Sequence, residues 1–127
     1  MRKLYRYIAI AASFSSLAYA EIKKPWDGSY QSFKGDYLIY SGDLGEQQPP
    51  TRADRKASFV VEGRLAKELF ESIAPDLKDA CGTLSGLRVR QKGHVDCTYD
   101  KDHPASPYTC HFGLDLRSGK STTGSIC

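Results

Sequence analysis

Several features that identify known classes of protein are missing from this sequence. The apolar stretch near its start, Ile8–Leu17, is shorter than the roughly 20 residues that a transmembrane helix needs. The four cysteines include no C-x-x-C pair, so they fit the ligand spacing of a zinc site poorly. The sequence also has no G-x-S-x-G motif, no internal repeat and no low-complexity segment. We therefore expect neither a membrane anchor nor an enzyme with a recognisable catalytic motif.

Gly119-Lys120-Ser121 matches the end of a phosphate-binding loop but does not satisfy its spacing. Such a loop reads G-x-x-x-x-G-K-[ST], with four residues between its glycines, whereas five residues separate Gly113 from Gly119. The residues that follow, S-T-T-G-S-I-C, do not continue as a helix. We interpret Arg117–Lys120 as a hairpin turn, because glycine tolerates the positive φ angle that such turns need.

The first 20 residues have the pattern of a secretory signal peptide. A basic stretch, Met1–Arg6, precedes the apolar core, and Ala18-Tyr19-Ala20 places small residues before a cut at Glu21. No cysteine follows that position directly, so we do not expect a lipid anchor. Cleavage would leave 127 − 20 = 107 residues, enough for one small domain. We predict a periplasmic or secreted protein.

Loss of the signal peptide changes the net charge of the chain. The full sequence has 18 Lys and Arg against 15 Asp and Glu, and the predicted signal removes three basic and no acidic residues. The remainder then has 18 − 3 = 15 basic against 15 acidic residues, a net charge of 0. General attraction to nucleic acid or to acidic membranes is therefore not expected. Nothing in the sequence indicates a cofactor.

The four cysteines predict two disulfides, because their number is even and the chain is expected to be exported. If Tyr99 lies opposite Tyr108 on neighbouring strands, Cys97 lies opposite Cys110. A two-residue loop at Ser118-Gly119 would also bring Cys110 opposite Cys127. We favour the first of two sets of bridges and leave the second open: Cys97–Cys110 with Cys81–Cys127, or Cys81–Cys97 with Cys110–Cys127.

Short stretches rich in aromatic and β-branched residues, several of them alternating with polar ones, predict strands. Turn residues such as Gly, Pro and Asp separate them. The pattern is clearest in Tyr108–Leu116, where four apolar side chains share one parity and should face one side of a sheet. The predicted strands are Asp36–Ser41, Lys56–Glu62, Leu87–Gln91, Val95–Tyr99, Tyr108–Leu116 and Ser121–Cys127.

Arg64–Ala74 is the one convincing helix. Its apolar residues recur at three- and four-residue spacing and form a single stripe, and Pro75 should end it. We expect Leu69 and Ile73 to be buried against the sheet. The residues expected on the solvated face include Lys67 and Glu71.

This ββαβββ-like order of elements predicts an α+β domain over residues 36–127 in which the helix packs on one face of an antiparallel sheet. The preceding segment, Glu21–Gly35, has no regular period but contains Trp26, Tyr30 and Phe33. This aromatic arm could bind a partner or a glycan. We prefer the interpretation that it packs over an open edge of the sheet, because buried aromatic area dominates small cores.

Three histidines near carboxylates are the candidates for metal binding or catalysis. His94 shares a strand face with Asp96, and His111 shares one with Asp115, whereas His103 lies in a Pro-flanked loop. The simpler interpretation is a polar outer face of a half-buried sheet, so we assign no metal ligand and no catalytic residue. A cleft in which His94, Asp96 and His111 converge would favour the alternative function, a small envelope enzyme or a ligand- or metal-binding protein.

Three regions are candidates for contact with a macromolecular partner. The first is a basic stripe on the third strand, which could bind an acidic protein or cell-wall polymer, or could protect an edge strand from aggregation. The other two are the polar loops Gly42–Arg55 and Asp100–Pro107. The residues concerned are Arg88, Arg90 and Lys92 in the stripe, Pro49 and Pro50 in the longer loop, and His103 in the shorter one.

The C-terminal pattern F-G-L-D-L-R-S-G-K-S-T-T-G-S-I-C, with K-E-L-F-E-S-I-A-P-D-L-K-D-A-C before it, resembles small exported bacterial proteins over most of the chain, from Tyr37 to Cys127. The resemblance implies a periplasmic protein and no particular activity, so it transfers no functional residue. In size and disulfide plan the chain is also similar to periplasmic lysozyme inhibitors and secreted protease inhibitors. We expect a non-enzymatic protein that binds a macromolecular partner, as an inhibitor or immunity protein against a cell-wall hydrolase or toxin.

Overall fold

The computed structural model describes residues 25–126. The chain divides into two compact units, Met1–Tyr30 and Gln31–Cys127, and the second contains the strands and helices described below. The predicted signal peptide, its cleavage site and Cys127 lie outside the described residues. Within residues 25–126, no helix has the length and apolar character needed to cross a bilayer.

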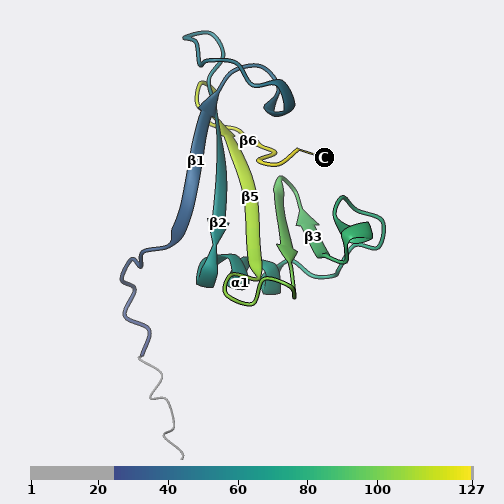
Figure 1. The fold of residues 1–127 in the computed structure, drawn as a ribbon. Coiled ribbons are helices and arrows are strands. Elements are labelled where there is room, and N and C mark those ends of the chain that lie inside the picture. Colours follow the sequence, from purple (N-terminus) through teal and green to yellow (C-terminus); the bar gives the residue numbers. More distant parts are fainter. Residues whose placement is uncertain (1–24, 127) are drawn as a thin grey trace, which may run out of the picture. The chain divides into compact units, whose positions relative to one another are not determined.

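The second unit is an antiparallel sheet with one α-helix packed on one face (Figure 1), which confirms the predicted α+β class. The order of its elements is ββαββββ, since the short strand β6 follows the predicted ββαβββ-like arrangement. Two single-turn 3-10 helices, η1 (Leu44–Glu46) and η2 (Thr83–Ser85), lie in loops. The helix α1 (Gly63–Ser72) follows the second strand. The strands are β1 (Lys34–Tyr40), β2 (Lys56–Glu62), β3 (Arg88–Lys92), β4 (Val95–Tyr99), β5 (Tyr108–Asp115) and β6 (Ser121–Thr122).

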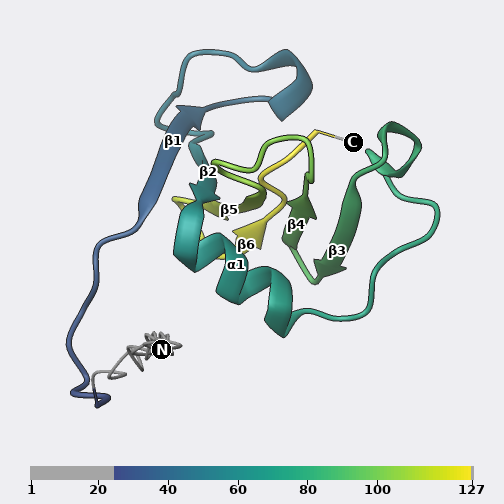
Figure 2. The same ribbon diagram turned by 60° about the horizontal axis from the view of Figure 1, so that its bottom comes forward.

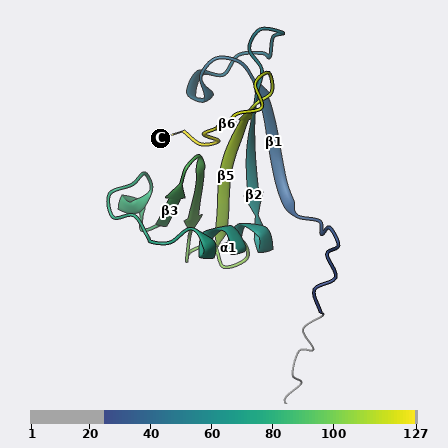
Figure 3. The same ribbon diagram turned by 180° about the vertical axis from the view of Figure 1, so that it is seen from behind.

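Strands distant in sequence lie side by side at the centre of the sheet. The spatial order is β1-β2-β5-β4-β3, and β6 pairs with β5. The predicted β1–β2 hairpin and the predicted β3–β4–β5 meander are both present, and β2 joins them by pairing with β5. After α1 the chain passes through η2 to reach β3 at the far edge, where the η2 segment lies beside that strand (Figures 1 and 3).

The hydrophobic core lies between the sheet and α1, which runs across the strands in Figure 2. The register sets Val61, Cys110 and Cys97 opposite one another on β2, β5 and β4, and all three are fully buried. Ala66 and Phe70 of α1 pack onto them. We call this side of the sheet the helix face and the opposite side the helix-free face.

The helix prediction is correct in position and faces but not in which residues are deepest. Lys67 and Glu71 are exposed, as expected. Leu69 and Ile73 pack against the core but are only partly buried, whereas Phe70 is 2% exposed. The helix ends at Ser72, two residues before the predicted end. Ile73 already has non-helical backbone angles. Pro75 disfavours the helical conformation for the residue directly before it, Ala74, so the helix could not continue far beyond this point.

The predicted register of β4 and β5 is confirmed. Tyr99 lies opposite Tyr108 and Cys97 opposite Cys110, and a disulfide joins the two cysteines. This bridge excludes the alternative pairing Cys81–Cys97 with Cys110–Cys127. The structure shows one disulfide with both ends in residues 25–126, rather than the two that the sequence predicted. The other predicted bridge, Cys81–Cys127, ends at a residue outside that range.

The last strand differs from its prediction. Leu114 pairs with Ser121, so the loop between β5 and β6 is longer than a two-residue hairpin, and Cys110 is not in register with Cys127. The backbone amide of Gly119 donates to the carbonyl of Asp115 and closes this wider turn. β6 ends at Thr122, because the tail then crosses the sheet. A Cβ atom on Gly124 would lie 2.2 Å from the carbonyl oxygen of Phe112, an approach that only glycine permits.

The expected burial of the N-terminal aromatic residues is not observed. Trp26 is 92% exposed and Tyr30 is fully exposed. Phe33, which precedes β1, is 60% exposed. The core of the sheet is thus filled by the rings of α1, β4 and β5. Phe33, which belongs to the same unit as the sheet, is not packed as the preferred interpretation expected.

Candidate functional site

Two rows of residues form the floor of the helix-free face. The antiparallel register sets the members of each row directly opposite one another on β2, β5, β4 and β3, so their side chains are neighbours. The first row is Glu62, Thr109, Thr98 and Val89, and the second is Val60, His111, Asp96 and Gln91.

Asp96 is the centre of a small polar cluster on this face. Its Oδ1 lies 3.3 Å from Nδ1 of His111, and its Oδ2 accepts a 2.6 Å hydrogen bond from the hydroxyl of Ser125. The two side chains are largely shielded from solvent, since those of His111 and Asp96 are 26% and 18% exposed. Ser125 donates to the carboxylate and not to the histidine, so the cluster is no nucleophile–base pair. Its visible role is to fix the C-terminal tail to the sheet.

The other histidines do not join this cluster. Nδ1 of His94 lies 2.9 Å from the hydroxyl of Ser121, and Nδ1 of His103 lies 2.6 Å from the carboxylate of Asp100. The convergence considered from the sequence therefore holds for Asp96 and His111 but not for His94. In residues 25–126 no three His, Cys, Asp or Glu side chains gather in a way that could hold a metal ion.

Asp115 is also used elsewhere. Its carboxylate accepts hydrogen bonds from the backbone amides of Arg117 and Ser118 at 2.8 and 3.2 Å. These bonds hold the pKa of Asp115 below its ordinary value. The residue shares a face with His111, as predicted, but it stabilises the β5–β6 turn.

Two cavities adjoin on the helix-free face and share Thr98. The first has a volume of about 480 Å³ and lies between the floor residues Glu62 and Thr109 and the loop Asp100–Pro107. The second has a volume of about 580 Å³ and contains Asp96 and His111. Residues of the segment 77–82, just before η2, and of the C-terminal tail form its walls. The convergence of Asp96 and His111 was considered from the sequence. The contribution of the C-terminal tail was not, because those residues were predicted to form a strand.

The basic stripe of β3 is not a free surface. Arg90 lies with its guanidinium carbon 4.2 Å from the centroid of the Phe70 ring, and it donates to the backbone carbonyl of Phe70 at 2.7 Å. Arg88 and Arg90 both bind the carboxylate of Asp76, at 2.8 and 2.6 Å. The two arginines thus stabilise the C-terminal end of α1 against the sheet. Of the predicted stripe, Lys92 is left as an exposed cation.

Acidification is expected to weaken this contact. Hydrogen bonds from Arg88 and then Arg90 lower the pKa of Asp76 to about 2. Because the folded-state pKa lies below the ordinary value of 3.8, the stabilisation is complete above that value and is lost as the pH falls towards 2. We expect Asp76→Asn to lower the melting temperature at pH 6 and to flatten its decline between pH 4 and 2. Thermal unfolding at several pH values measures both effects, and Glu71→Gln on the outer face of α1 is the control. Parallel curves for wild type and Asp76→Asn would contradict the assignment.

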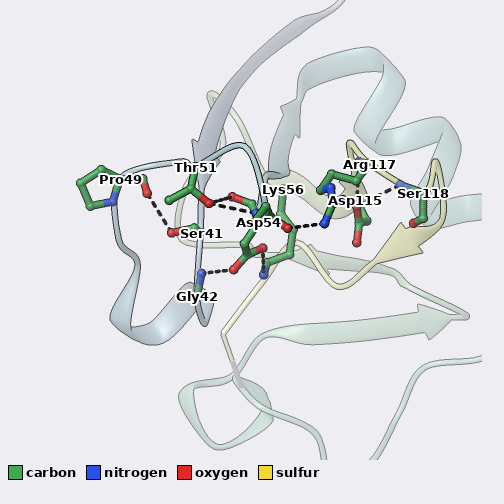
Figure 4. A network of polar contacts seen from close by, with 10 residues as sticks. Ser41, Gly42, Pro49, Thr51, Asp54, Lys56, Asp115, Arg117 and Ser118 are labelled. Atoms are coloured by element: carbon green, nitrogen blue, oxygen red, sulfur yellow. Dashed lines mark hydrogen bonds and ion pairs between the residues drawn. The ribbon is translucent and has the colours of Figure 1, made fainter.

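The loop Gly42–Arg55, at the end of the β1–β2 hairpin away from α1, is held by a network of hydrogen bonds (Figures 1 and 4). The backbone groups of Ser41 and Gln48 bond to each other at 2.9 Å in both directions. The hydroxyl of Ser41 donates to the carbonyl of Pro49 at 2.8 Å. These bonds close the first half of the loop around η1.

The second half of the loop is fixed by Asp54. Its carboxylate accepts bonds from the backbone amide of Gly42 and from Nζ of Lys56, each 2.7 Å long (Figure 4). The Lys56 ammonium, followed by the Gly42 amide, lowers the pKa of Asp54. Arg117 donates to the carbonyl of Ala53 at 2.6 Å, which ties the loop to the β5–β6 turn. Residues 45–53 nevertheless remain exposed, so the loop is both fixed and accessible.

Asp54 and Arg117 were not identified from the sequence. A local signal for Asp54 existed, since the spacing T-x-x-D allows a Thr hydroxyl to accept from the Asp amide, and Thr51 does so at 2.9 Å. The contact with Arg117 joins residues far apart in sequence, so no local pattern could reveal it. Comparisons of the chain with protein-family models, curated proteins and solved structures found no match, so the functional argument rests on this geometry.

Proposed function

We propose that this protein is an exported, non-enzymatic protein that binds a macromolecular partner through the loop Gly42–Arg55. The specific form of the proposal is an inhibitor or immunity protein against a cell-wall hydrolase or a toxin. The supporting observation is that residues 45–53 are exposed while the loop is fixed at Ser41, Gly42 and Ala53.

A fixed loop suits this function for thermodynamic reasons. Binding orders flexible segments at a cost in conformational entropy, so a loop that is already ordered loses less on association. Pro49 and Pro50 restrict their own φ angles and the conformation of the residue before each of them. Gln47 already has extended backbone angles, with φ −62° and ψ 141°. The exposed stretch from Gln47 to Pro50 can therefore enter a partner's cleft in one conformation.

Export is a separate part of the proposal. A signal peptide ending at Ala20 and a disulfide between Cys97 and Cys110 both suit an oxidising compartment. The proposal includes the second bridge, Cys81–Cys127, which would tie the η2 segment to the C-terminal end.

The test compares how tightly a partner binds to two double variants, one in the loop Gly42–Arg55 and one on the exposed face of α1. Pro49→Gly/Pro50→Gly keeps the backbone carbonyl that Ser41 bonds but removes the proline restriction. Each such change costs about 0.4–1 kcal/mol in conformational entropy, so we expect affinity for the partner to fall by roughly tenfold. The control, Arg64→Ala/Lys67→Ala, changes the exposed face of α1 and should leave affinity unchanged. The partner is first purified from envelope extract on immobilised wild-type protein, and affinities are then measured by calorimetry.

Three outcomes would refute the proposal. The first is that wild-type protein retrieves no partner from the extract. The second is equal affinity of the partner for the wild type and Pro49→Gly/Pro50→Gly. The third is an equal loss of affinity in both variants, which would indicate a general effect on the protein rather than a contact through the loop.

A further inference from the structure

The helix-free face contains a second candidate site, independent of the loop Gly42–Arg55. The two cavities described above share the lining residue Thr98, and we call the pair the trough. The two cross-strand rows form its floor. Its walls are the loop Asp100–Pro107, the segment 77–82 before η2, and the tail from Thr123 to Ile126. Two neighbouring cavities on one sheet face fit an extended chain better than a compact small molecule.

Charge in the trough has one sign. Among the described residues that line it none is Lys or Arg, although the chain as a whole contains 18 of them. Lys34 pairs with Glu62 at 2.9 Å and is itself 69% exposed. Lys78 and Lys101 are chain neighbours of Asp79 and Asp102 but do not line the cavities. The histidines present are His103 and His111, each beside an aspartate. The carboxylates that line the trough are Glu62, Asp79, Asp96, Asp100 and Asp102.

Apolar side chains lie between these carboxylates. Leu87, Pro104 and Pro107 line the first cavity, and Leu77, Val89 and Ile126 line the second. Lys and Arg side chains have an apolar stem and a charged end, so they can pack on such walls while the charge reaches a carboxylate. A simple metal ion would not use the apolar walls, and residues 25–126 offer no set of three metal ligands.

We propose that the trough binds an extended basic segment of a partner polypeptide. Asp79 and Asp102, one in each cavity, provide its most accessible charges. Both residues are exposed, and among residues 25–126 no hydrogen bond or ion pair uses either carboxylate. Asp96 and Asp100 are instead engaged by Ser125 and His103 and serve as fixed negative charge beneath the ligand.

The test measures binding of a fluorescent octapeptide of alternating Lys and Gly to the wild-type protein at low ionic strength. We expect saturable binding that weakens as salt is added, because exposed charges are screened. Asp79→Asn/Asp102→Asn should weaken it roughly fivefold, since the double variant removes two exposed ion pairs with the peptide and each such pair contributes little. The control Glu68→Gln/Glu71→Gln makes the same change of net charge on the outer face of α1 and should bind like the wild type.

Other outcomes would overturn the proposal. Absence of binding at low ionic strength would refute the site, and equal weakening by the two double variants would leave only general charge attraction. Equal binding of an octapeptide of alternating Glu and Gly would remove the role of the carboxylates. Spermine binding as tightly as the Lys-Gly peptide would assign the trough to small polyamines instead. The trough does not include the loop Gly42–Arg55, so Pro49→Gly/Pro50→Gly should bind the peptide as tightly as the wild type. A negative result at one of the two proposed sites therefore does not refute the other.

Discussion

Phe70→Ala is expected to lower the free energy of unfolding by about 3–5 kcal/mol. The ring is 2% exposed and packs 5.4 Å from the centroid of Tyr108 and 6.3 Å from that of Tyr99. Arg90 stacks on it from the edge of the sheet. Truncation therefore removes the transfer free energy of a whole aromatic side chain and leaves a cavity between α1 and the sheet. It also removes the surface on which the guanidinium lies.

Urea denaturation followed by circular dichroism measures this change. Lys67→Ala on the same helix is the control and should change stability by at most about 0.5 kcal/mol, as exposed substitutions usually do. Leu69→Ala should have an intermediate effect, because that side chain is only partly buried. A loss at Leu69 larger than that at Phe70 would mean that the helix is rotated relative to the arrangement described above.

The rotation of α1 illustrates what the sequence can predict. The spacing of Leu65, Ala66, Leu69, Phe70 and Ile73 predicted a helix with one buried stripe, and that stripe is present. A stripe on a helix spans a wide arc, so the pattern alone does not say which member lies at its centre. The neighbouring sheet decides this, since Phe70 meets the rings of Tyr99 and Tyr108. Those contacts join residues that are distant in sequence.

The same reasoning explains the error at the basic stripe. Alternation along β3 correctly placed Arg88 and Arg90 on one face of the strand, but it did not show that this is the face covered by α1. Asp76, which binds both arginines, lies in the irregular segment after the helix. Its position depends on how the chain leaves α1, and no periodic pattern describes that path.

The candidate sites were predictable to the extent that they depend on strand register. Pairing of Tyr99 with Tyr108, inferred from alternation, implies that Asp96 lies opposite His111, and this pair forms part of the trough floor. The walls of the trough were not predictable, because they consist of irregular segments. The loop Gly42–Arg55 was identified by its length and its two prolines, whereas its rigidity depends on Asp54 and on the distant Arg117.

The register of β4 and β5 also underlies the second large effect. Cys97→Ala/Cys110→Ala is expected to destabilise the protein by about 3 kcal/mol, because the bridge closes a loop with a sequence separation of 13. Restriction of the unfolded chain accounts for most of this value in the loop-entropy description. The complete burial of both residues adds a smaller packing loss when their sulfur atoms are removed.

Substitution is a better test than reduction, because a reductant would also open any other bridge in the protein. Urea titrations should show a lower midpoint together with a steeper dependence of stability on urea, since an unbridged unfolded chain exposes more surface. The increase in slope separates loss of the cross-link from loss of packing, which would lower the midpoint alone. The single variant Cys97→Ala, which also lacks the bridge, should show the same increase in slope. Both variants could instead show an unchanged slope and lose less than about 1 kcal/mol of unfolding free energy. That result would mean that the bridge does not restrict the unfolded chain. Packing in the core of β4 and β5 would then account for the stability of this part of the sheet.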